Sequence, residues 1–123
     1  MSIMLKLMQK IPEGTVLKTP SRKKEFTVGK VYEKGVSVLV GQTETPITIP
    51  SSCFEGVPEF LREKGWIRIG VVHDVPFEGS FESYVQSFTH RTSASSYVVP
   101  ILETIGIIEV DRKRPSKIRL KTQ

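Results

Sequence analysis

A run of cations near the C-terminus is the clearest place where this sequence gathers side chains that could do chemistry. Three consecutive basic residues, Arg112, Lys113 and Arg114, lie within residues 111–116. Polar residues and a proline are enough to form a turn. Three adjacent cations are not needed for it, and they repel one another. Three more cations follow at alternate positions: Lys117, Arg119 and Lys121. Charges gathered in this way are typical of a surface that binds a polyanion.

The residues on either side of this basic turn predict a β-hairpin. Residues 107–110 and 117–120 are rich in isoleucine, valine and leucine and flank a polar turn that contains a proline. Because side chains alternate between the faces of a strand, the cations of the second strand share one face. Basic residues also protect edge strands against aggregation, so a purely protective role stays open.

The start of a predicted helix over residues 93–105 is a second candidate binding site. Small or hydroxyl-bearing residues let a helix end approach an anion, and the free N–H groups there favour a phosphate. Arg91 is the best candidate for a direct contact. The neighbouring candidates are Thr92, Ser93, Ser95 and Ser96. The alternative is that these residues only cap an exposed helix start.

A third basic group lies in a predicted turn of the first half. It consists of Arg22, Lys23 and Lys24. If the two halves pack side by side, this turn extends the same positive surface; as an isolated loop it is merely solvated.

Catalytic and metal sites are much less well supported. His73, Asp74 and His90 have no spacing that enforces metal binding. Cys53 stands beside Phe54 at the expected start of a helix, where burial would make it a poor nucleophile. We therefore predict no catalytic residue, no metal ligand and no cofactor.

Two further patterns in the sequence bear on this conclusion. Residues 109–113 contain an acid-x-lysine sequence of the kind that many magnesium-dependent nucleases carry, but no convincing upstream aspartate accompanies it. This keeps a nuclease as a weak alternative. Trp66 opens a predicted strand after Gly65, and we interpret it as a core residue and not as a platform for stacking bases.

The first half of the chain predicts a small β-structure. Short runs rich in β-branched and aromatic residues are separated by turn residues, at 15–18, 24–32, 36–40 and 46–50. Gly29 lies inside the longest run and indicates a bend. This pattern favours an SH3-like sheet or barrel over residues 1–50.

The second half, residues 51–123, mixes helices and strands. The predicted order is a helix at 59–64 after Pro58, a strand at 66–72, helices at 81–88 and 93–105, and the hairpin. Ser80 is the expected cap of the helix at 81–88. Pro100 lies inside the last helix, which we expect to be single but kinked. The predicted fold class is therefore α+β, with the two halves packed together.

This order resembles the winged helix–turn–helix family over the C-terminal half. The resemblance includes the step from residues 101–105 through Gly106 directly into the hairpin. It implies that the helix at 93–105 enters a major groove and that the hairpin, with its turn at 111–117, is a wing that contacts the DNA backbone. Some winged helices bind only proteins.

Composition and charge distribution fit a soluble, cytoplasmic, nucleic-acid-binding class. The 123 residues are 38% hydrophobic and 25% charged, with one cysteine and no apolar run of membrane-spanning length. The net charge of +5 is polarised along the chain. Residues 1–50 hold 8 Lys/Arg against 4 acids, residues 51–90 hold 3 against 6, and residues 91–123 hold 7 against 3.

We therefore expect a non-catalytic protein that binds duplex DNA, as a regulator or as the DNA-contacting subunit of an assembly. Winged-helix proteins often dimerise, but the sequence identifies no dimer face. One alternative is a protein–protein adaptor that binds a basic partner through its acidic middle. The acids in question are Glu55, Glu59, Glu63, Asp74, Glu78 and Glu82. RNA binding by the small barrel is a third possibility.

Overall fold

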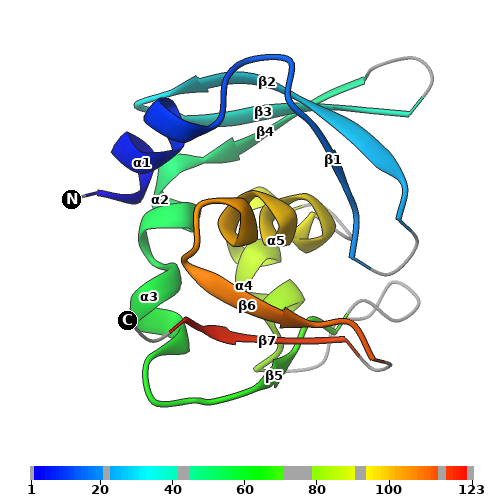
Figure 1. The fold of residues 1–123 in the computed structure, drawn as a ribbon. Helices are drawn as coiled ribbons and strands as arrows, with labels where there is room; N and C mark the ends of the chain where they lie inside the picture. The colour runs from blue at the N-terminus through cyan, green and yellow to red at the C-terminus, as the bar shows by residue number, and fades with distance from the viewer. Residues whose placement is uncertain are drawn as a thin grey trace.

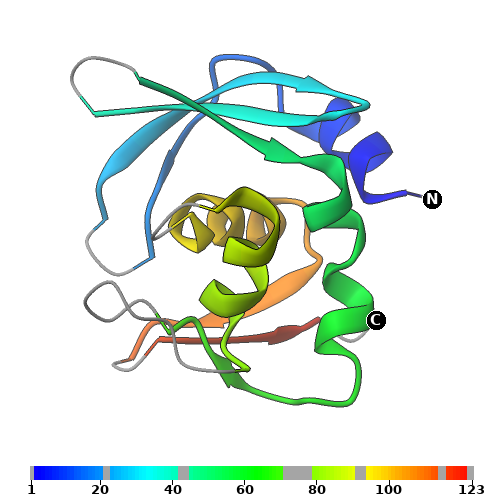
Figure 2. The same cartoon turned by 180° about the vertical axis from the view of Figure 1, so that it is seen from behind.

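The computed structural model describes residues 2–20, 23–41, 45–70, 79–90, 94–113 and 116–121. Two antiparallel sheets lie at opposite sides of the molecule, with helices between them (Figure 1; Figure 2 shows the opposite side). The predicted α+β class is confirmed. The SH3-like and winged-helix assignments are finer than this and stay predictions.

The four-stranded sheet follows the predicted strands closely. It runs in the order β1-β2-β3-β4, with β1 at Val16–Lys18, β2 at Glu25–Tyr32, β3 at Gly35–Val40 and β4 at Thr45–Pro50. The register of β2 against β3 shifts between Val28 and Val31, which confirms the bend expected at Gly29. A Cβ on Gly29 would come within 2.6 Å of the Ser37 hydroxyl, so the close approach needs glycine.

The N-terminal helix α1, Ile3–Lys10, was not predicted. Its start is capped twice: the Ser2 hydroxyl accepts a hydrogen bond from the Leu5 N–H, and the Glu55 carboxylate accepts from the N–H groups of Ile3 and Met4 at 2.9 and 3.3 Å. Such acceptors satisfy the free donors of a helix start. The serine cap and the apolar spacing that follows it were the available signals.

The second half has the predicted order of elements. After α2 (Ser51–Glu55) come α3 (Val57–Leu61), β5 (Ile67–Arg68), α4 (Phe81–Thr89), α5 (Ser95–Thr104), β6 (Ile108–Asp111) and β7 (Lys117–Leu120). The three strands form a second sheet in the order β5-β7-β6. As expected, Ser80 caps α4, its hydroxyl accepting from the Ser83 N–H.

Element boundaries differ at two places. The helix expected to run from residue 59 to residue 64 begins at Val57 and ends at Leu61, because Glu63 already adopts a left-handed backbone with φ 62°. Of the strand expected over residues 66–72, residues 67–68 are paired, and residues 71 and 72 lie outside the described part of the chain. Pro100 stays within one continuous helix, as expected.

A single apolar core joins the two halves. Buried residues of both sheets and of every helix contribute to it. Helix α5 contacts β1 on one side and β6 on the other. Phe26 of β2 meets Tyr97 of α5 edge to face, with ring centroids 5.1 Å apart. Residues 1–50 and 51–123 therefore pack as layers around α5, which both views place between the sheets.

A buried carboxylate fixes α5 to α4. Glu82 is only 1% exposed, although the adaptor alternative counted it among the acids that would face a basic partner. One of its oxygens accepts hydrogen bonds from the Ser95 backbone N–H at 3.2 Å and from the Ser95 hydroxyl at 2.7 Å. The other accepts from Gln86 at 2.9 Å. Glu82 thus serves the start of α5 as an acceptor supplied by another helix.

Replacing Glu82 with alanine should destabilise the fold strongly. The change leaves the buried N–H and hydroxyl of Ser95 without this acceptor, so we expect a loss of about 2–3 kcal/mol in the free energy of unfolding. Urea denaturation followed by circular dichroism measures it. Glu59→Ala is the control, because Glu59 is exposed and should cost below about 0.5 kcal/mol. Equal stability losses for the two variants would contradict this role of Glu82.

Candidate nucleic-acid interface

The outer face of the three-stranded sheet carries two of the predicted wing cations, Lys117 and Arg119. In the register, Arg119 of β7 lies opposite Glu109 of β6, and Lys117 lies between Arg68 of β5 and Asp111 of β6. Ile118, which separates the two cations, is fully buried. Lys117 and Arg119 therefore share the face that points away from the core, as the alternation of the strand predicted.

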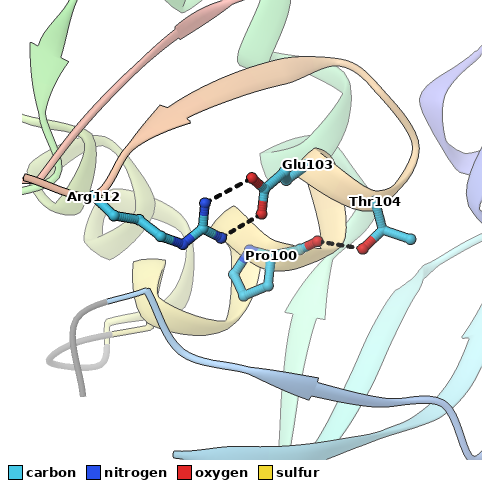
Figure 3. A network of polar contacts seen from close by, with 4 residues as sticks. All are labelled: Pro100, Glu103, Thr104 and Arg112. Carbon is cyan, nitrogen blue, oxygen red and sulfur yellow. Dashed lines mark hydrogen bonds and ion pairs between the residues drawn. The ribbon is translucent and has the colours of Figure 1, made fainter. Parts of the chain in front are cut away.

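Carboxylates already hold two of these cations. Arg112 donates two hydrogen bonds to the Glu103 carboxylate of α5, at 2.9 and 2.6 Å (Figure 3). These hydrogen bonds raise the pKa of the guanidinium above its already high value. Arg119 donates to Glu109 across the strands at 2.5 Å. Both pairs are partly exposed, so each contributes little to stability.

The three lysines of the hairpin are different. Lys113 and Lys121 are exposed and Lys117 is half-buried. Within the described parts of the chain, none of the three forms an ion pair. Their ammonium groups are thus the cations on this face that stay open to an external anion, whereas Arg112 and Arg119 would have to exchange or share a carboxylate. Arg114 lies outside the described residues.

The helix expected to enter a DNA groove is mostly buried. Val98, Val99, Ile101 and Leu102 have no exposed surface. Ser95, proposed as a contact, is also fully buried and bonded to Glu82. Ser95 therefore has no hydroxyl to offer to DNA, because its side chain points into the core against Glu82 of α4. Ser96 is half-buried, and Arg91, Thr92 and Ser93 lie outside the described residues.

The basic turn of the first half lies toward the hairpin. Both views place the end of β1 and the start of β2 on the same side of the molecule as the end of β6 and the start of β7. Lys23 and Lys24, which precede β2, are exposed. Arg22 lies outside the described residues. The described part of this turn is therefore placed to add to the positive side of the molecule.

Trp66 is an exposed residue and not the predicted core residue. It keeps 42% of its surface open. The Arg119 guanidinium lies over the indole ring, 4.4 Å from its centroid. The alternation of Trp66, Ile67, Arg68 and Ile69 was the missed signal, because Ile69 is buried and Ile67 pairs with the buried Ile118. Trp66 and Arg68 consequently belong to the outer face.

The described residues do not support a cysteine nucleophile or a metal site. Burial raises the pKa of the Cys53 thiol to about 12, so the nucleophilic thiolate is absent at neutral pH. His90 is exposed at the end of α4, and His73 and Asp74 lie outside the described residues. No group of three or more histidine, cysteine, aspartate or glutamate side chains in the described chain gathers to hold a metal.

Comparisons with protein-family models, with curated proteins and with solved structures found no match for this chain. Its function is therefore inferred from its own residues and their geometry. Over the described residues, no helix is both long enough and apolar enough to cross a membrane.

The buried thiol yields a direct test of the structure around Cys53. An unfolded thiol titrates near pH 8.5, whereas a pKa of about 12 keeps the folded one protonated at pH 8. Ellman's reagent should therefore react slowly with the native protein and rapidly in concentrated urea, since Cys53 is the single cysteine. Rapid and complete reaction of the native protein at pH 8 would contradict the buried position.

Proposed function

We propose that this protein binds DNA without catalysis and contacts its phosphates through the outer face of the β5-β7-β6 sheet and the β6–β7 turn. The observation that carries the proposal is the set of open ammonium groups on this face, Lys113, Lys117 and Lys121, beside the two arginines. Neutralising phosphates with lysine releases counterions and supplies affinity that does not depend on sequence.

The order of elements supports a wing-like use of the hairpin. Helix α3, strand β5, helices α4 and α5 and the hairpin follow one another as in the winged helix–turn–helix family. The projecting hairpin then contacts duplex DNA, and Lys23 and Lys24 extend the contact along the same side. Phosphate contacts of this kind fix a protein on the duplex but do not read its sequence.

The buried state of α5 changes how such a protein recognises DNA. Ser95 and the apolar residues Val98, Val99, Ile101 and Leu102 are enclosed, so most of the described part of α5 is not available to base edges. Direct readout through a helix in the major groove needs several exposed polar side chains. The proposed binding is accordingly dominated by backbone contacts and has little sequence specificity.

The intramolecular carboxylates set the strength of this binding. Both carboxylate oxygens of Glu103 accept hydrogen bonds from Arg112, in the same bidentate geometry in which arginine binds a phosphate. An incoming phosphate must compete with this carboxylate and is also repelled by its charge. We therefore expect moderate affinity that falls steeply as the salt concentration rises.

Removing the open lysines should weaken DNA binding in a characteristic way. We compare the parent with the triple variant Lys113→Gln/Lys117→Gln/Lys121→Gln. The slope of log affinity for duplex DNA against log salt concentration should become shallower by roughly 2 to 3, because each lost phosphate contact removes about 0.9 from the slope. Fluorescence anisotropy at several salt concentrations measures the slope.

The matched control removes three other exposed lysines. In Lys10→Gln/Lys30→Gln/Lys34→Gln the net charge changes equally, but these residues lie on α1, β2 and the β2–β3 turn, in the other half of the molecule. The control should keep most of the parental slope. If both variants lose the same amount, binding follows net charge alone and the proposed face is wrong.

Freeing Arg112 should strengthen binding. Glu103→Gln removes the competing carboxylate and its negative charge, so we expect the affinity for duplex DNA at low salt to rise severalfold. Glu59→Gln is the control, because it removes one charge and one arginine pair on α3. An unchanged or reduced affinity of Glu103→Gln would show that Arg112 does not contact DNA.

A further inference from the structure

Trp66 is the unexplained feature of the cationic face. Among the described residues, the other exposed large hydrophobic residues are Leu5, Met8, Val16 and Tyr32, which belong to the first half of the chain. Among the described residues, Trp66 is the exposed one of this kind that lies on the three-stranded sheet. Exposing so large an apolar ring has a free-energy cost, which binding of a flat apolar surface would recover.

The surroundings of Trp66 combine an aromatic ring with cations and an open groove. Arg119 covers part of the ring and is itself held by Glu109. This chain of contacts restrains the indole before any ligand arrives, which lowers the entropic cost of binding. A groove runs past the ring, lined by Trp66, Glu103, Ile108, Glu109, Val110, Arg119 and Lys121.

The spacing of the cations suits an extended strand. Lys117, Arg119 and Lys121 follow one another at every second residue, which places them roughly 6.6 Å apart along the strand direction. This is close to the separation of neighbouring phosphates in an extended single strand of DNA. A straight cationic row beside an aromatic ring is the combination by which proteins bind single strands, with the bases stacked on aromatic side chains.

We propose that the face binds DNA containing unpaired nucleotides, with one base stacked on Trp66 and the phosphates of that strand on Lys117, Arg119 and Lys121. This rests on the proposed function, because it names the form of DNA that the same face prefers. In blunt duplex DNA the bases are enclosed, so the lysines act there without Trp66. A single strand, or a duplex with a single-stranded end, engages both.

The test uses two DNAs and the fluorescence of the protein itself. Trp66 is the single tryptophan, so its emission reports directly on stacking. A dT oligomer of about 12 nucleotides, within the usual site sizes of single-strand-binding proteins, is compared with a blunt duplex. We expect dT to quench the emission and to bind more tightly than the duplex at equal salt.

Two variants separate this inference from the proposed function. Trp66→Ala should weaken dT binding about tenfold, because this is the affinity that stacking of one base contributes. It should leave the affinity for duplex DNA nearly unchanged. Tyr32→Ala, which removes an equally exposed aromatic ring from the other sheet, should change neither. Thermal unfolding checks that both variants keep the fold.

The outcomes are distinct. The proposed function stands if the parent binds both DNAs and the lysine variant loses affinity. The inference is then wrong if Trp66→Ala binds dT as the parent does, or if it loses affinity for both DNAs equally. If the parent binds neither DNA at low salt, the proposed function fails and the inference fails with it.

Discussion

The burial of helix α5 between two sheets is the constraint on which the rest of the structure depends. The four-stranded sheet reaches it through β1 and through the Phe26–Tyr97 contact, and the three-stranded sheet reaches it through β6. Its start is held by the carboxylate of Glu82. Because one helix is the shared core of both halves, neither half can move away without exposing apolar surface.

This constraint decides which surface is left for a partner. The sides of α5 are largely covered, whereas the outer face of the three-stranded sheet is open and carries Lys117 and Arg119. On that face the lysines attract an anion, while Arg112 and Arg119 already form ion pairs with Glu103 and Glu109. On the proposal that this face binds DNA, its own carboxylates would weaken the attraction and favour reversible binding.

Local structure was largely predictable from the sequence, because local physics determines it. The strands of the first half, the cap at Ser80 and the continuous helix around Pro100 follow from residue preferences over short distances. The cation-bearing face of β7 follows from simple alternation, since Ile118 must point inward.

The errors concern contacts between distant segments. Ser95 looked like a free hydroxyl and Glu82 like a surface acid, but they satisfy each other inside the core, 13 residues apart. Trp66 was placed in the core because it follows Gly65 and opens a predicted strand. Its exposure follows from the pairing of β5 with β7, 51 residues further along the chain. The alternation of residues 66–69 separates the two faces of this strand, but it is the pairing with β7 that turns one of them to the core.

The most direct test of the account maps the contact surface itself by following backbone and indole N–H signals in NMR spectra during titration with DNA. If DNA binds the outer face of the three-stranded sheet, shifts should concentrate on β7, on Lys113 and on the indole of Trp66, while α1 and the buried residues of α5 stay unchanged. Shifts that concentrate on the four-stranded sheet or on α1, or the absence of any shift at low salt, would contradict it.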